Sequence, residues 1–260
     1  MIDLYNGYTT DDVLRDIPFE GKSLILYPVK VYQEKQFNRL LQYILYSRKH
    51  YGIDRKVELL SYVIQINGAY YLEINKKLSN DEAIGLVIKD LEELFTIICR
   101  QNIKFNIDED NKICFTNKEK TIQITNKNFN LLRIVVLKQN AIHEPKIFKN
   151  EIEKELTEEW LKRQEEKRKG NSIEGMGEKM NLITCSTSKT YESLENENIL
   201  QFNCDYLRCC NNMNFIITSM FRTVSDKVSI INYTDEVLSH LYADPYKGME
   251  QDLGSFLGSL

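Results

Sequence analysis

The amino-acid sequence predicts an α+β fold, with an N-terminal mixed domain of short antiparallel strands and amphipathic helices, followed by a charged helix and a smaller all-α C-terminal unit. Alternating polar and apolar residues, which are typical of strands, occur at 17–31 and 103–124, whereas helical spacing of apolar residues recurs along the chain. A run rich in Glu, Lys and Arg separates the two parts. We expect a mixed α+β domain at 1–145, a charged helix with a glycine-containing linker at 146–177, and a helical unit with a loosely ordered tail at 178–260.

The first part of the chain contains one hairpin signal. Residues 1–16 have few apolar anchors, which predicts a loosely held arm, and residues 17–31 read as a β-hairpin with its turn at Glu20-Gly21. Pro28 should confine the second strand to an edge or end it early, because proline has no N–H to donate. Helical spacing then predicts helices at 33–50 and 55–66.

A helix start and three strands follow. Ser79 and Glu82 stand three residues apart, the spacing of a capping box, so a helix should begin there and run to about Gln101. Three short segments of period two come next, separated by polar turns. They predict a meander of three antiparallel strands at 103–107, 112–116 and 120–124.

The stretch 126–169 joins the two parts of the chain. Apolar residues at helical spacing from Phe129 to Asn140 predict a largely buried helix, which is interrupted at 141–145. Ile152, Leu156 and Trp160 then recur every four residues among Glu, Lys and Arg. This pattern is typical of an exposed helix with one narrow apolar seam.

The remaining residues favour a linker, helices and a tail. Three glycines within 170–177 predict the linker, because glycine raises the entropy cost of fixing one conformation. The tail from Asp244 combines three more glycines with scattered apolar residues, so it should become ordered only against another surface. Helices are expected at 178–186, at 199–225 where Asn211-Asn212 can break the helix, and at 234–242.

Composition indicates a cytoplasmic protein. A net charge of −4 argues against a general nucleic-acid binder, which needs a basic surface to displace counterions from phosphates. Apolar runs are far shorter than the roughly 20 residues that span a bilayer, and residues 1–7 lack the pattern of a signal peptide. The six cysteines form no regular framework, which favours reduced thiols.

No pattern is typical of a catalytic, cofactor or metal site. Residues 108–112 resemble the start of a calcium loop, but Lys112 stands where an oxygen ligand belongs, so a hairpin turn is favoured. Cys204, Cys209 and Cys210 include no Cys-x-x-Cys pair, which favours buried helical thiols over zinc. The sequence also lacks a nucleophile elbow and a phosphate-binding motif. We therefore expect a non-catalytic protein without a cofactor.

Three features follow one another along the chain. The strand Leu-Ile-Leu-Tyr-Pro-Val-Lys, ending at Lys30, precedes an amphipathic helix. A helix ending in Leu-Lys-Gln-Asn-Ala-Ile at Ile142 precedes the acidic-basic helix and the linker. A helical C-terminal part ends in Asp-Pro-Tyr and an acidic, glycine-containing tail. Together they resemble a poorly characterised family of proteins encoded in the tail-assembly region of phages and prophages of low-GC Gram-positive bacteria, and this likeness spans most of the chain.

The resemblance implies a role in virion morphogenesis in the bacterial host cytoplasm. A bacteriophage tail assembly chaperone would mask apolar surfaces of tail-tube or tape-measure proteins, and a minor tail or virion component would bind them in the particle. Two alternatives stay open: a DNA-associated regulator with a winged-helix-like meander, and an enzyme with a dispersed acidic site. The sequence leaves the oligomeric state open. Candidate partner contacts are the seam Ile152, Leu156 and Trp160 and the tail residues Phe256, Leu257 and Leu260.

Overall fold

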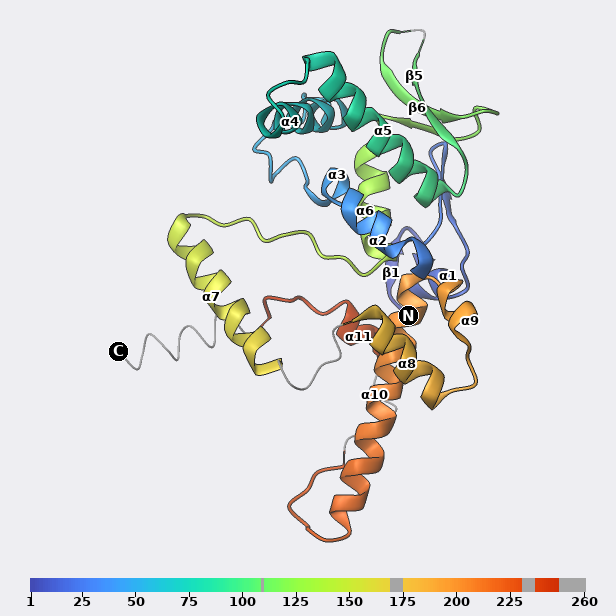
Figure 1. Cartoon of the computed structure of the whole chain (residues 1–260), viewed down its shortest axis with the longest axis vertical. Helices are drawn as coiled ribbons and strands as arrows, with labels where there is room; N and C mark the ends of the chain where they lie inside the picture. Colours follow the sequence, from blue (N-terminus) through green and yellow to red (C-terminus); the bar gives the residue numbers. More distant parts are fainter. Residues whose placement is uncertain (109, 169–174, 231–236, 248–260) are drawn as a thin grey trace. The chain divides into compact units, whose positions relative to one another are not determined.

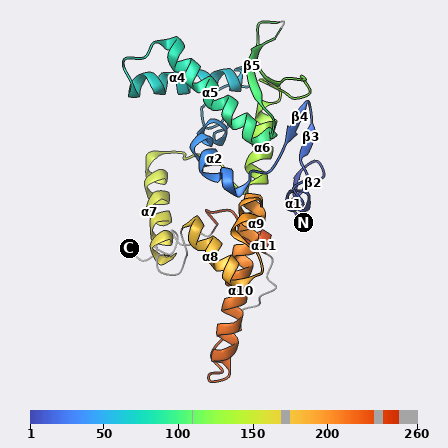
Figure 2. The ribbon, with the colours of Figure 1, turned by 45° about the vertical axis from the view of Figure 1, so that its right-hand side comes forward.

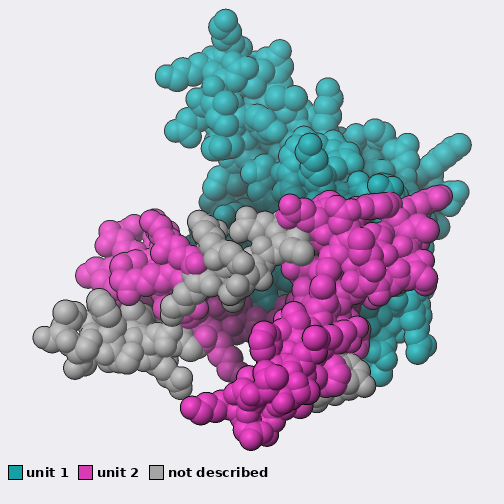
Figure 3. All heavy atoms as spheres, turned by 60° about the horizontal axis from the view of Figure 1, so that its bottom comes forward, with its two compact units in different colours: residues 1–145, 195–201 teal, residues 146–194, 202–260 magenta. Residues whose placement is uncertain are grey.

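The computed structural model describes residues 1–108, 110–168, 175–230 and 237–247 (Figure 1). It confirms the α+β class, since helices dominate the described chain and the strands pair antiparallel in small sheets. The chain divides into two compact units, shown in different colours in Figure 3. Unit 1 contains residues 1–145 and 195–201, and unit 2 contains residues 146–194 and 202–260.

The N-terminal residues belong to the core of unit 1, so the expectation of a loose arm is wrong. Strands β1 (Asp3–Tyr5) and β2 (Tyr8–Thr9) form a hairpin that leads into helix α1 (Thr10–Leu14). Leu4 and Val13 are 2% and 0% exposed. The ammonium group of Lys138 also donates to the carbonyl oxygen of Leu4 at 2.7 Å. Few apolar residues are enough to anchor this segment, because the fold buries Leu4 and Val13 almost completely.

The next hairpin is confirmed, but its turn lies two residues later than expected. Strands β3 (Phe19–Gly21) and β4 (Leu24–Leu26) pair with Gly21 opposite Leu24. The turn residues Lys22 and Ser23 have φ angles of 53° and 61°. Positive φ at both central residues is what a type I′ turn requires. The Glu20-Gly21 prediction was wrong because Gly21 forms the last strand pair.

The first helical region is shorter and more broken than its periodicity indicates. The predicted helix at 33–50 becomes a 3₁₀ turn η1 (Val31–Gln33) and helices α2 (Glu34–Leu40) and α3 (Gln42–Leu45). Helix α4 (Leu59–Ile74) begins four residues later than predicted and ends eight residues later. Helix α5 (Asn80–Cys99) follows the predicted capping box, in which the Ser79 amide donates to Glu82 at 2.8 Å and the Glu82 amide donates to Ser79 at 3.3 Å.

The predicted meander forms in unit 1, and the helix after it lies in the core. Strands β5 (Ile103–Ile107), β6 (Ile113–Asn117) and β7 (Gln123–Thr125) pair antiparallel in that order. Phe115 on β6 packs edge-on against Phe95 of α5, with ring centroids 4.9 Å apart. Helix α6 (Phe129–Gln139) is buried along most of its length, which confirms the prediction for this segment.

Residues 195–201 return to unit 1, although the sequence placed them with the C-terminal part. Asn198 forms an antiparallel bridge with Lys30, and the amide of Val31 donates to the Glu197 carbonyl oxygen at 2.9 Å. Asn198 is fully buried, and its Nδ2 donates to the carbonyl oxygen of Val13 at 2.7 Å. This contact joins residues 185 positions apart.

The described part of unit 2 is helical. The expected break at Asn211-Asn212 is absent, because one helix continues through these residues. Among the described residues, no helix has both the length and the apolar character needed to cross a membrane. The helices are α7 (Glu151–Arg168), α8 (Met176–Ser186), α9 (Tyr191–Glu195), α10 (Ile199–Arg222, whose first three residues belong to unit 1) and α11 (Val237–Leu241).

Candidate protein-binding surface

Helix α10 has an apolar seam along one face. Its members are separated alternately by four and three residues. A period of 3.5 residues keeps such side chains on one side of a helix, as in a coiled coil. The seam consists of Phe202, Tyr206, Cys209, Met213, Ile216 and Met220.

The first half of the seam is buried. Phe202 is 0% exposed and Cys209 is 7% exposed. Helix α8 contacts this half, since the ammonium group of Lys179 lies 5.1 Å from the ring centroid of Tyr206 and the Ser186 side chain hydrogen-bonds with the thiol of Cys209. This half of the seam therefore contacts α8 of the same unit.

The second half is exposed, although its sequence pattern is the same. Five apolar residues of this half and one apolar residue in the turn that follows α10 are 46% to 80% exposed. In Figures 1 and 2 this half of α10 extends beyond α8. We call these residues the apolar stripe: Met213, Ile216, Ile217, Met220, Phe221 and Val224.

Uncharged residues border the apolar stripe. At 100° per residue, Asn214 lies along one edge of its helical part, and Asn212 lies along the other. Arg208 and Arg222 project from the opposite face of the helix, and no Asp or Glu occurs between residues 206 and 225. The stripe therefore offers apolar contact area without charges that would select a partner by electrostatic attraction.

The cysteines of α10 serve as apolar side chains. Burial, with a smaller effect from Asp205, raises the pKa of Cys204 to about 11. Burial also raises the pKa of Cys209. Both thiols are therefore protonated at neutral pH, and a protonated thiol is a poor nucleophile and metal ligand. Within the described ranges, no group of three or more His, Cys, Asp or Glu side chains is arranged to hold a metal ion.

The contacts predicted from the sequence differ in their exposure. On α7, Ile152 is 68% exposed, while Leu156 and Trp160 are partly buried. Thr157 is fully buried, and its hydroxyl donates to the carbonyl oxygen of Glu153 at 2.7 Å. The predicted tail contacts Phe256, Leu257 and Leu260 lie outside the described residues.

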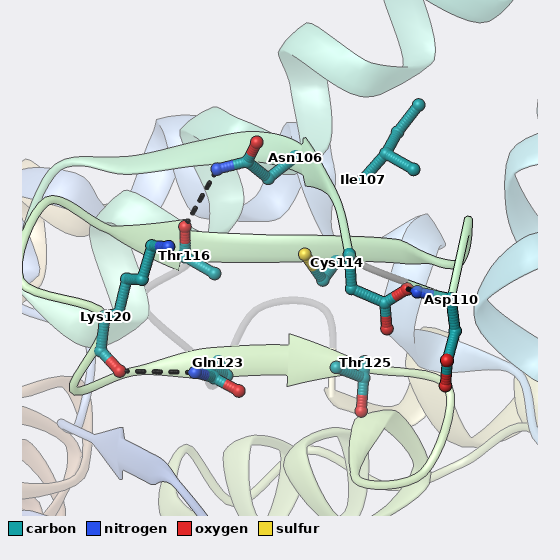
Figure 4. Close-up of a pocket in the computed structure, with 9 residues that line it drawn as sticks. Asn106, Ile107, Asp110, Cys114, Thr116, Lys120, Gln123 and Thr125 are labelled. Carbon is teal, nitrogen blue, oxygen red and sulfur yellow. Dashed lines mark hydrogen bonds between the residues drawn. The ribbon is translucent and has the colours of Figure 1, made fainter.

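A hollow of about 390 Å³ lies on the polar face of the meander in unit 1 (Figure 4). Across this face, Asn106 Nδ2 donates to the hydroxyl of Thr116 at 3.5 Å. Burial, helped by the charge of Asp108, raises the pKa of Cys114, so this thiol is protonated. Binding pockets for small molecules are mostly apolar with few polar groups. The polar lining here is instead typical of a solvated sheet face.

The apolar stripe was missed in the sequence, although its spacing was readable. Residues 213, 216, 217 and 220 recur at helical spacing, which is the signal of an amphipathic helix. Asparagine is unfavourable in helix interiors, so a break was expected at Asn211-Asn212. That break would have divided the seam into two short pieces, and the continuous face was therefore not recognised. An exposed stripe also looks identical to a buried one in sequence.

Comparisons of the chain with protein-family models, with curated proteins and with solved structures found no match. The exposed face of α10 is therefore the feature from which we infer a function.

Proposed function

We propose that this chain is a non-catalytic assembly protein that binds apolar helical segments of other proteins through the apolar stripe of α10. One observation carries this proposal: five apolar side chains on one face of α10, and Val224 in the turn that follows it, are 46% to 80% exposed. Soluble monomers rarely expose continuous apolar patches larger than a few hundred Å² unless a partner covers them.

The arrangement of the stripe favours a helical partner. Side chains at positions i, i+3, i+4 and i+7 are the anchors of a helix that packs into an apolar groove or against another helix. Met213, Ile216, Ile217 and Met220 have this spacing. Their flexible and branched side chains can adapt to partners of different shape, and methionine is suited to this role by its unbranched thioether.

The partner class comes from the resemblance to phage tail-assembly-region proteins. Tail-tube and tape-measure proteins expose apolar surfaces before they polymerise, and a chaperone or minor tail component would cover them. The α7 seam, with Ile152 as its most exposed member, would add a second contact. The tail residues Phe256, Leu257 and Leu260 would add a third. On this proposal the protein works in the bacterial host cytoplasm.

Affinity capture with matched variants tests this proposal. Tagged wild type, Ile216→Asp and Asn211→Asp are recovered from cells that make the protein in its native context, and bound proteins and nucleic acid are quantified. Asn211 lies on the far face of α10, so Asn211→Asp adds the same charge away from the stripe.

Wild type and Asn211→Asp should recover tail-tube or tape-measure proteins. Ile216→Asp should recover at least about tenfold less, because a carboxylate buried at an apolar contact loses its hydration. Equal recovery by Ile216→Asp would remove the stripe from the account. Recovery of duplex DNA without tail proteins would favour the regulator alternative.

A further inference from the structure

The apolar stripe is compatible with itself. Its bordering helical residues Asn212 and Asn214 are uncharged, so two stripes can meet without repulsion between like charges. Arg208 and Arg222 lie on the far face of α10, where they remain in water when the stripe is covered. Charged residues beside a seam normally determine partner choice in helix pairs, and none occurs here.

The size of the stripe suits a pair of identical chains. Six side chains, each about half exposed or more, present roughly 600 Å² of apolar surface, close to the ~800 Å² that each partner contributes to a standard interface. The helical part of the stripe extends over nine residues, from Met213 to Phe221, which corresponds to about 14 Å of helix. Two-fold pairing of one patch with itself is the commonest arrangement of soluble oligomers.

We infer that the apolar stripe binds a second copy of this chain, with the two α10 helices antiparallel about a two-fold axis beside Ile217. In this register Met213 lies opposite Phe221 of the second copy. The antiparallel orientation follows from the first half of α10, where Tyr206 and Cys209 are in contact with α8 of their own chain. Antiparallel helices place these two covered halves at opposite ends of the pair, whereas parallel helices would place them side by side.

Self-association would shield the stripe until another protein displaces the second copy, a consequence that rests on the proposed function. The dimer itself does not depend on it.

Sedimentation velocity of the purified full-length chain tests the dimer. Wild type should sediment as a species of twice the monomer mass of 30.6 kDa, with a dimer fraction that rises with concentration. Ile216→Asp should raise the dissociation constant at least about 100-fold, since the two-fold axis buries two carboxylates. Asn211→Asp should change it less than about twofold. Circular dichroism of each variant establishes that the helices are retained.

A charge pair tests the orientation. Met213→Lys and Phe221→Glu should each weaken the dimer, and the double variant should recover at least about tenfold relative to either one. In the antiparallel pair each introduced lysine faces an introduced glutamate. In a parallel pair each introduced lysine would face a lysine and each introduced glutamate would face a glutamate, so the double variant would form the weakest dimer.

Three results would overturn the inference: wild type that stays monomeric throughout the concentration series, a dimer insensitive to Ile216→Asp, or a double variant weaker than both single variants. Monomeric wild type that still captures tail proteins would leave the proposed function standing. A dimer that depends on the stripe but captures no tail proteins would support the dimer and contradict the proposed function.

Discussion

Phe202 and Ile216 stand two heptads apart on the same face of α10, yet Phe202 is fully buried whereas Ile216 is 50% exposed. One repeating pattern thus serves two purposes along a single helix. Its first half is buried, and its second half presents apolar area to solvent. The difference depends on what covers each half.

Alanine substitutions at these two positions should have very different effects on stability. Phe202→Ala should lower the free energy of unfolding by about 3–5 kcal/mol, because it leaves a cavity in a packed core. Ile216→Ala should lower it by less than about 1 kcal/mol, since the side chain already contacts water. Urea unfolding of monomeric protein measures both. Similar losses at the two sites would contradict the assignment of buried and exposed halves.

Asn198 should matter more than a typical asparagine near a helix start. Its Oδ1 accepts from the Gln201 amide at 2.9 Å, Gln201 Oε1 accepts from the Asn198 amide at 2.9 Å, and its Nδ2 donates to the Val13 carbonyl oxygen. Asn198→Ala removes a helix cap and leaves a buried carbonyl without its donor. We expect a loss of about 1–3 kcal/mol in urea unfolding. Asn212→Ala, at an exposed position, is the matched control, and an equal loss in both variants would count against the buried cap.

Acid should weaken unit 1 through Asp16. Burial alone raises the pKa of Asp16, but hydrogen bonds from Arg100 and Lys30 together lower it below its ordinary value. Arg100 donates to both carboxylate oxygens at 2.7 Å. Because the folded pKa lies below the unfolded value of about 3.9, this stabilisation is complete above that pH and is lost as pH falls through the folded pKa.

Asp16→Asn should therefore destabilise the protein by roughly 1–3 kcal/mol at pH 7 and by less at a pH below the folded pKa of Asp16. Urea unfolding at several pH values gives both numbers. A variant with the same loss of stability at both pH values would show that the carboxylate charge has no part in this contact.

The thiols should react in order of exposure. Cys185 is exposed, whereas Cys99, Cys114, Cys204 and Cys209 are buried. Burial raises the pKa of Cys99 to about 12, which leaves almost no thiolate at pH 8. A disulfide reagent at pH 8 should label Cys185 first, with the buried thiols reacting only in denaturant. Rapid labelling of Cys204 in the native protein would contradict the burial of the first half of α10.

Local signals in the sequence predicted several elements correctly. The Ser79–Glu82 pair identified the start of α5, and period-two segments identified the meander, because capping and strand alternation depend on neighbouring residues. The burial of α6 also followed from its continuous apolar face. These features need no knowledge of distant contacts.

Features that depend on distant contacts were not predictable. Leu4 and Val13 gave little sign of a core, and nothing near Asn198 in sequence indicates its bridge to Lys30. The positive φ angles of Lys22 and Ser23 could not be predicted either, because the usual sequence signal for that turn is Asn-Gly or Asp-Gly. Likewise, the stripe at Ile216 becomes a candidate site only when its exposure is known.

Site-specific photocrosslinking tests the central claim, that the apolar stripe of α10 is a protein-binding surface. A photoreactive phenylalanine analogue replaces Ile217 in one variant and Asn211, on the far face, in another. The account predicts crosslinks from position 217, to a second copy in the purified protein and to tail-tube or tape-measure proteins in the native context, with few from position 211. Equal crosslinking from the two positions, or none from position 217, would contradict it.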